Sequence, residues 1–270
     1  MFWEKVWLGI ILTGSCFSYQ IKPWMDPWLE FHFEPSFMYR YYPNVEGGYN
    51  PKSYSSHDRF TQIKAYVSPL ENFDAELLIE FADTRKQSLG MQSLGAQLRY
   101  QWLDCIRKDV ISWITCMNLF YVSPRSLKDV SCYYHGKWNV ELGQSLGKEW
   151  SFDSFLLVPY SYISVGQANF GYPWLRCLMD LYAQYKNSEV DCFLDGYFGL
   201  GHLNRVNVDN FYGWGKIRHK SIEIGVKYRY QISKIWGTVG FMYSYRFYAE
   251  NYPSKASSFE ISYQLPFSML

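Results

Sequence analysis

The sequence predicts a single-domain, all-β protein, a closed antiparallel up-and-down transmembrane β-barrel of about twelve strands. Three observations predict it. Apolar and polar residues alternate with period two along most of the chain. Aromatic residues make up 20% of the 270 residues, yet the mean hydropathy is only −0.24. Short and long connections between the alternating segments follow one another in strict order.

The alternation is clearest near the C-terminus, in segment 258–267. One face there is apolar and consists of Phe259, Ile261, Tyr263, Leu265 and Phe267. The other face carries Ser258, Glu260, Ser262 and Gln264. Further strands are expected at 28–41, 59–68, 73–81, 93–102, 110–122, 132–145, 152–164, 174–185, 191–201, 221–230 and 238–247. Their lengths suit tilted strands that cross a bilayer.

The connections distinguish a membrane barrel from a soluble β-sandwich. The short ones are 69–72, 104–108, 148–151, 186–189 and 231–234. The long ones are 43–58, 83–91, 123–130, 165–173, 202–217 and 248–257. A transmembrane barrel has tight turns on its periplasmic rim and longer loops outside, whereas a sandwich has no reason to sort its loops in this way. The even strand count places both termini of the chain on the periplasmic rim.

The N-terminus resembles a secretory signal. A short apolar run at 6–12 precedes small residues that end at Ser18, which predicts a signal at 1–18 and a barrel at 19–270. An apolar first strand and a lipoprotein acylated on Cys16 stay open as alternatives. Without Cys16 five cysteines remain, and no CxxC spacing occurs, so the pairing of cysteines cannot be derived and no metal site or cofactor is expected. The net charge of +1 gives no reason to expect nucleic acid as a partner.

The last strand supports a resemblance to a known class. Segment Phe259 to Phe267 resembles the C-terminal strand of Gram-negative outer-membrane β-barrels, although Ser268, Met269 and Leu270 follow it. The resemblance concerns the architecture of the whole mature chain, which is similar to that of porins. It implies a location in the cell outer membrane. It also implies outer-membrane lipid and the barrel-assembly machinery as partners.

The polar faces of the predicted strands supply candidate lumen residues. Acidic candidates, with one histidine among them, are Glu30, His32, Glu34, Glu76, Glu80, Glu141, Asp180, Glu223 and Glu260. Basic candidates are Arg40, Lys64, Arg99, Lys137, Arg176, Lys227, Arg229 and Arg246. Pairing of the first and last strands is expected to bring Glu30, His32 and Glu34 near Glu260 and Lys64.

Two functions fit these charges. The leading hypothesis is a porin-like channel in which they select small hydrophilic solutes. The alternative is a lumen closed by ion pairs and hydrogen bonds among the same groups, in a structural or host-contact surface barrel whose loops act.

A lipid hydrolase, of the phospholipase or lipid A deacylase type, is the enzyme alternative. Barrels that resemble outer-membrane phospholipase use a Ser and a His on the outer wall. The only His-x-Ser here is His219-Lys220-Ser221, and strand parity turns His219 and Ser221 inward, so they are weak catalytic candidates.

Tryptophans near strand ends predict interfacial girdles, with a sugar-binding platform as the alternative: Trp24, Trp28, Trp102, Trp113, Trp150, Trp174 and Trp236. The polar and aromatic loop 202–217 is the best candidate for an outside binding surface or a lid folded into the pore.

Overall fold

The computed structural model describes residues 21–268, so the expected signal at 1–18 lies outside the described residues. Its twelve long strands are β1 (Glu30–Tyr42), β4 (Ser56–Leu70), β5 (Phe73–Asp83), β6 (Gly90–Leu103), β7 (Ser112–Val122), β8 (Trp138–Gly147), β10 (Phe155–Ala168), β11 (Trp174–Tyr185), β12 (Ser188–Leu200), β14 (Arg218–Ser233), β15 (Gly237–Glu250) and β17 (Ser257–Ser268). Five short strands belong to the connections: β2 (Asn44–Val45), β3 (Gly48–Tyr49), β9 (Trp150–Phe152), β13 (Val206–Asn207) and β16 (Pro253–Ser254). Two 3-10 turns, η1 (Cys105–Arg107) and η2 (Ser126–Lys128), complete the order.

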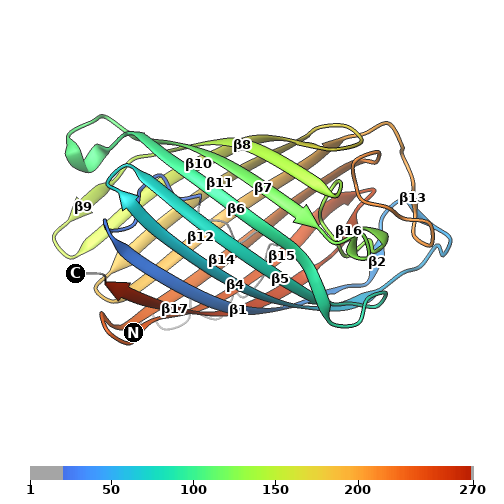
Figure 1. Cartoon of the computed structure of the whole chain (residues 1–270), viewed down its shortest axis with the longest axis horizontal. Helices are drawn as coiled ribbons and strands as arrows, with labels where there is room; N and C mark the ends of the chain where they lie inside the picture. Colours follow the sequence, from blue (N-terminus) through green and yellow to red (C-terminus); the bar gives the residue numbers. More distant parts are fainter. Residues whose placement is uncertain (1–20, 269–270) are drawn as a thin grey trace, which may run out of the picture.

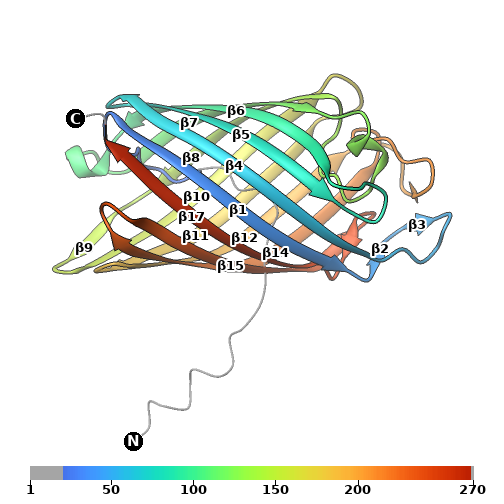
Figure 2. The same cartoon turned by 60° about the horizontal axis from the view of Figure 1, so that its bottom comes forward.

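The long strands form one closed antiparallel barrel (Figures 1 and 2). Each strand pairs with its neighbours in sequence, and the first strand, β1, pairs with the last, β17. The pairing of β10 with β11 closes the ring, and β9 only extends the hairpin at the start of β10. The predicted fold class and strand number are therefore confirmed.

The wall is apolar outside and polar inside, as the alternation predicted. On β6, Leu98 faces outward and is 45% exposed, whereas the neighbouring Arg99 faces the lumen and is 2% exposed. Successive side chains of a strand point to opposite faces, so this difference repeats along each strand. An apolar outer wall of this kind is stable in hydrocarbon, and the closed sheet leaves no unpaired strand edge there. Within residues 21–268, no α-helix is both long and apolar enough to cross a membrane.

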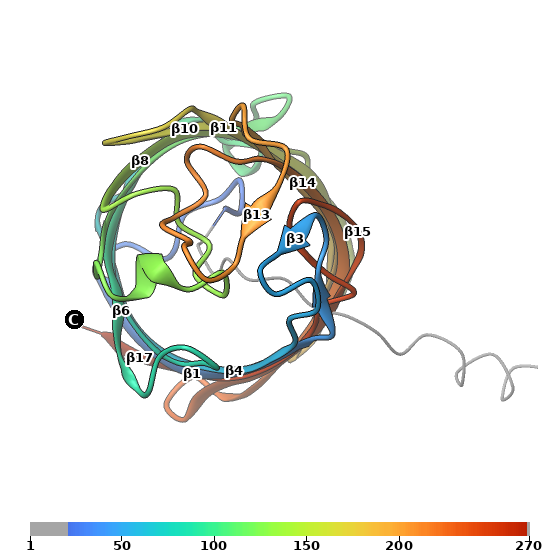
Figure 3. The same cartoon turned by 90° about the vertical axis from the view of Figure 1, so that its right-hand side faces the viewer.

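The two rims differ, and the long loops gather at one of them. Strand β1 begins and strand β17 ends at the opposite rim, among the short turns (Figure 1). We call the two ends the short-turn rim and the long-loop rim. The loops of the long-loop rim lie across the mouth of the barrel when it is viewed from that side (Figure 3).

One strand begins later than its sequence suggested. A strand was predicted at 132–145, but β8 begins at Trp138. All residues from Ser131 to Gly136 are buried, on both alternating faces, because this stretch enters the barrel mouth instead of joining the wall. The segment predicted at 174–185, by contrast, coincides with β11.

Candidate functional site

The lumen wall is cross-linked by ion pairs between neighbouring strands, all of them buried except that of Arg229 with Glu189, which is partly buried. Six of the predicted basic residues take part, namely Arg40 with Asp58 (2.6 Å), Lys64 with Glu34 (3.4 Å), Arg99 with Asp74 (3.2 Å), Arg176 with Asp195 (3.0 Å), Arg229 with Glu189 (2.7 Å) and Arg246 with Glu223 (2.9 Å). A buried charge is costly to hold unless it is paired, so these contacts explain how so many charges fit inside a narrow barrel. Among the described residues, Lys227 has no such pair within 4.0 Å.

The other acidic candidates are also buried, but their partners differ. Glu141 accepts hydrogen bonds from the Tyr162 hydroxyl (2.8 Å) and the Trp174 indole (2.9 Å). Glu80 accepts bonds from the amides of Gln62 and Gln92.

Three further acids lack full pairing. Both carboxylate oxygens of Glu76, Oδ1 of Asp180 and Oε1 of Glu260 are buried without a hydrogen bond in the described part of the chain.

The register of β1 against β17 corrects one expectation. Glu260 lies opposite Met38, while Glu30, eight residues before Met38 on β1, lies opposite Ser268. Glu30 and His32 therefore do not meet Glu260. They contact each other (3.4 Å), and the Gln264 amide bonds to Nδ1 of His32 (2.9 Å). The expected contact of Glu34 with Lys64 is present.

Two further residues lie elsewhere than expected. Lys137 is half-buried in the loop before β8, and its ammonium lies 5.5 Å from the ring of Tyr121, which is on the outward-facing parity of β7. Lys137 is therefore not a lumen residue. Trp174 is 4% exposed and faces the lumen, so it is not part of an interfacial girdle.

A segment before the first strand occupies the lumen near the short-turn rim. The Ser145 hydroxyl donates to the carbonyl of Ile21 (2.6 Å), and Arg99 donates to the carbonyls of Lys22 (2.8 Å) and Trp24. The Trp24 ring packs against Tyr160 and Tyr182, at 5.8 and 5.0 Å between ring centroids. Trp24 is thus a lumen residue instead of a girdle residue, and segment 21–28 narrows the barrel from within.

A small charged cavity remains above this segment. Its volume is about 120 Å³, and its polar lining includes Lys22, Asp26, Glu34, Lys64, Arg176, Asp180, Asp191, Lys227 and Arg229. It brings together six predicted site residues from β1, β4, β11 and β14, namely Glu34, Lys64, Arg176, Asp180, Lys227 and Arg229. A space of this size holds a few water molecules or one small solute.

At the other end, four loops form what we call the loop cap: residues 43–55, 123–137, 201–217 and 251–256. Together with wall residues they enclose an apolar core of Tyr42, Val45, Tyr54, Val130, Ala168, Trp174, Tyr197, Val206, Val208, Phe211, Trp214, Ile217, Tyr252 and Ala256. Trp214 is fully buried, and its indole donates to the carbonyl of Cys132 (2.6 Å). The cap is therefore a folded unit with its own core, and it lies in the barrel mouth.

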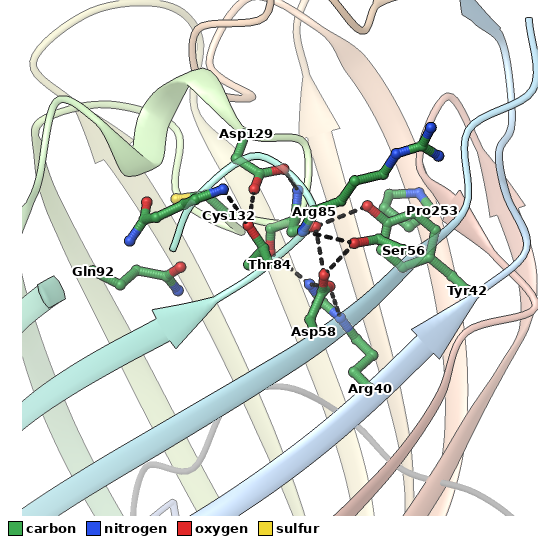
Figure 4. Close-up of polar contacts among 12 residues, drawn as sticks. Arg40, Tyr42, Ser56, Asp58, Thr84, Arg85, Gln92, Asp129, Cys132 and Pro253 are labelled. Atoms are coloured by element: carbon green, nitrogen blue, oxygen red, sulfur yellow. Dashed lines mark hydrogen bonds and ion pairs between the residues drawn. The ribbon is translucent and has the colours of Figure 1, made fainter. Parts of the chain in front are cut away.

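Charged groups tie the cap to the wall, as Figure 4 shows. Arg40 on β1 donates to Asp58 on β4 (2.6 Å) and to the carbonyl of Ser131 in the cap (2.7 Å). The Ser131 hydroxyl donates to Asp58 (3.0 Å). Thr84 donates to Asp129, which burial gives a pKa above the ordinary value for an aspartate. These bonds fix loop 123–137 against β1 and β4.

A second anchor is a cluster of buried rings. His135, in loop 123–137, stacks on Trp174 at 4.2 Å and lies 3.0 Å from the hydroxyl of Tyr197 through its Nδ1 atom. Its Nε2 atom lies 3.2 Å from Nε2 of His219 on β14. Burial, with a smaller effect from His219, holds the pKa of His135 well below its ordinary value, so this ring is neutral at pH 7.

A glycine makes room for this cluster. Gly199 lies opposite His219 in the pairing of β12 with β14, and a Cβ atom at this position would stand 2.3 Å from the His219 ring. His219 and Ser221 both face inward, as parity predicted, and both are buried. His219 is engaged with His135, and neither residue faces lipid, so their geometry is that of a packing cluster.

The outer surface of the cap contains a crevice of about 930 Å³, larger than the lumen cavity. Residues of loop 201–217 form most of it, and Tyr49 and Phe170 complete it. This is the loop that the sequence singled out as an outside binding surface. The sequence could not predict its partner, Tyr49, because the contact depends on the parallel pairing of β13 with β3.

Known proteins resemble this chain in fold but not detectably in sequence. No family model and no curated protein matches the sequence. Among solved structures, the barrel is similar to an outer membrane channel from Pseudomonas putida F1, with a TM-score of 0.58, 10% identity, and 91% of this chain and 98% of that chain covered. It is also similar to the NanC porin, with a TM-score of 0.54, 10% identity, and 86% and 98% covered. The β domain of the Bordetella autotransporter BrkA gives a TM-score of 0.50 at 11% identity, with 88% and 100% covered.

The fold and the apolar wall together define the class: the protein is an outer-membrane β-barrel of twelve strands. The similar structures include channels and an autotransporter domain, so the activity of this protein cannot be inferred from its fold alone.

Proposed function

We propose that the protein is a surface barrel with a closed lumen, whose long loops face outward and carry its function. The observation that supports this proposal most strongly is the apolar core of the loop cap, with Trp214, Val206 and Val208 all at 0% exposure. Burying one large apolar side chain contributes about 1.5–3 kcal/mol, so opening the mouth would require the loss of several such contributions. We therefore expect the cap to be rigid and to keep the mouth closed.

The ion pairs below the cap support the same proposal. They join neighbouring strands across the lumen face, as Arg40 joins Asp58, and most of the lumen charges have a partner within the protein. A charge that is already paired interacts weakly with a passing ion. Segment 21–28 narrows the other end.

A porin-like channel for small hydrophilic solutes is the second candidate, because one observation favours it. The cavity of about 120 Å³ contains Lys227, which has no ion pair among the described residues, and Asp180, whose Oδ1 atom has no hydrogen bond there. For this function, both the loop cap and segment 21–28 must move aside. A lipid hydrolase has less support, since His219 and Ser221 face the lumen.

Conductance of the refolded protein in planar bilayers tests the proposal. We expect the wild type to give no resolved current steps at any voltage. The substitution Trp214→Ala, which removes the central ring of the cap, should produce intermittent steps, whereas Tyr212→Ala, at an exposed position of the same loop, should stay silent. Regular steps from the wild type, with ion selectivity that changes in Lys227→Glu, would establish the channel instead.

A further inference from the structure

The crevice on the loop cap is lined by three kinds of group, namely aromatic rings, cations and amides. Its lining consists of Tyr49, Phe170, Leu203, Asn204, Arg205, Asn207, Asn210, Phe211, Tyr212, Gly213, Lys216 and Ile217. We propose that this crevice binds an acidic oligosaccharide, a sugar chain that carries sulfate or carboxylate groups. The proposal rests on the proposed function in one respect, namely that the loops face outward.

The aromatic groups provide flat apolar surfaces in contact with solvent. Tyr212 is 47% exposed and Tyr49 is 42% exposed. Phe170 and Tyr212 stack with their centroids 5.6 Å apart, which holds the Tyr212 ring in place. Rigid aromatic rings offer a large contact area at a small entropic cost, and the apolar face of a sugar ring packs on such a surface.

The charged groups of the lining are all positive. Arg205 and Lys216 are exposed, and neither forms an ion pair with any residue that the structure describes. The lining includes no Asp or Glu. A guanidinium binds sulfate or carboxylate oxygens through two parallel hydrogen bonds, and an ammonium adds a second point of positive charge. The crevice is therefore complementary to an anion, and a neutral sugar would leave both cations without a partner.

Amide side chains supply the remaining polar contacts. The amides of Asn204 and Asn210 make no hydrogen bond within residues 21–268. Asn207 uses only its oxygen, which accepts from the backbone N–H of Asn210 (3.1 Å). An amide donates and accepts at once, which matches a sugar hydroxyl.

The loop that presents these groups is held firmly from below. Between Arg205 and Asp209, exposed or half-buried residues alternate with Val206 and Val208, which are fully buried in the cap core. Val206 lies in β13, which pairs with β3, and the carbonyl of Val208 accepts a hydrogen bond from Lys86. A binding surface that is already ordered loses little entropy when the ligand arrives. The volume of about 930 Å³ suits a short oligosaccharide of a few rings.

Calorimetry on the folded full chain in detergent tests the proposal, with a heparin-derived hexasaccharide as the sulfated probe. The neutral probe is the same hexasaccharide after desulfation, N-acetylation and reduction of its carboxylates to alcohols. We expect saturable binding of the sulfated probe only. The double variant R205E/K216E should weaken that binding roughly tenfold or more, since each reversed charge opposes an anion. Tyr212→Ala should weaken it by a smaller factor through the loss of stacking.

Lys52→Glu is the matched control, because Lys52 is an exposed cation on a neighbouring cap loop but not part of the lining. It should change the affinity less than about twofold, a difference below 0.5 kcal/mol. Absence of saturable binding, equal binding of the neutral probe, or equal loss in K52E and R205E/K216E would each overturn the proposal. A heat-induced shift in gel mobility equal to that of the wild type verifies that every variant is folded. A conducting wild type would contradict the closed lumen but not this site, so the two proposals fail separately.

Discussion

The Nε2 atoms of His135 and His219 lie 3.2 Å apart, although 84 residues separate them in the sequence. His135 belongs to the loop cap and His219 to the wall, so this contact joins the two parts of the molecule. At this distance one ring donates a proton and the other accepts it, which requires that at least one ring be neutral. The rings of Trp174, Tyr197, Trp214 and Tyr252 surround the pair.

Acid is expected to loosen the cap. The pKa of His135 is well below its ordinary value in the folded protein and returns to about 6.5 when the cap opens. The open form therefore binds more protons, and the stability of the cap is complete above that pH and declines as the pH falls below it. Amide hydrogen exchange in segment 123–137, corrected for intrinsic rates, should be faster at pH 5 than at pH 7.5.

The variant His135→Phe provides the control for this effect. Its ring can still stack on Trp174, but it has no nitrogen to titrate. We expect the exchange of segment 123–137 to depend much less on pH in this variant. An equal dependence on pH in both proteins would assign the effect to groups other than His135.

The ion pair of Arg40 with Asp58 should contribute strongly to stability only as a pair. Asp58→Ala leaves the buried Arg40 guanidinium without its carboxylate and also removes the acceptor for the Ser131 hydroxyl. Breaking one side of such a pair costs about 3–5 kcal/mol, whereas replacing both sides by apolar residues is often close to neutral. Urea unfolding of Asp58→Ala and of the double variant R40M/D58A measures the difference.

A nearby surface pair is the control. Arg59 follows Asp58 on β4, and its guanidinium lies 3.6 Å from the carboxylate of Asp83. Both partners of this pair are exposed. Asp83→Ala should change the free energy of unfolding by less than about 1 kcal/mol. A similar loss in Asp58→Ala and Asp83→Ala would show that burial does not matter for the lumen pairs.

Alternation and loop parity were enough to predict the barrel, because each depends only on neighbours along one strand. Leu98 and Arg99 show why this works, since adjacent residues of β6 face hydrocarbon and lumen. The same logic failed for the segment that contains Cys132 and His135. In a strand these two residues would point to opposite faces, but here both are buried. Period two reports that two faces differ, and a segment inside the mouth has no exposed face.

The site was less predictable, because it depends on contacts between distant segments. The inward direction of Arg40, Glu223 and Arg246 followed from parity, but their partners followed from register, which the sequence does not specify. Glu260 illustrates the limit, because a plausible pairing with Glu30 was displaced by eight residues. Trp24 was misassigned to a girdle because segment 21–28, which is not part of the wall, lies in the lumen and packs this ring against Tyr160 and Tyr182.

Trp24 should act as the wedge that keeps segment 21–28 in the lumen. Its ring lies against Tyr160 and Tyr182. Trp24→Ala removes these contacts, and the segment then depends on bonds from Arg99 and Ser145. Loss of a large, partly buried ring costs about 1–3 kcal/mol locally, so the amides of this segment should exchange faster by about fivefold or more. Ser145→Ala, which removes one hydrogen bond, should have a smaller effect, and the reverse order would contradict the wedge role.

Gly199 should be essential to the contact between the cap and β14. A Cβ atom there would stand 2.3 Å from the His219 ring, so Gly199→Ala must displace that ring from its place beside His135. Overpacking of this kind costs about 1–3 kcal/mol. We expect a weaker near-ultraviolet circular dichroism signal from the ring cluster and a lower melting temperature of the cap, while the barrel keeps its gel mobility. Gly90→Ala is the control, since a Cβ atom at Gly90 would meet its nearest neighbour at an ordinary 3.6 Å. If Gly199→Ala keeps the wild-type signal and the wild-type dependence of cap exchange on pH, then His219 does not hold the cap through His135.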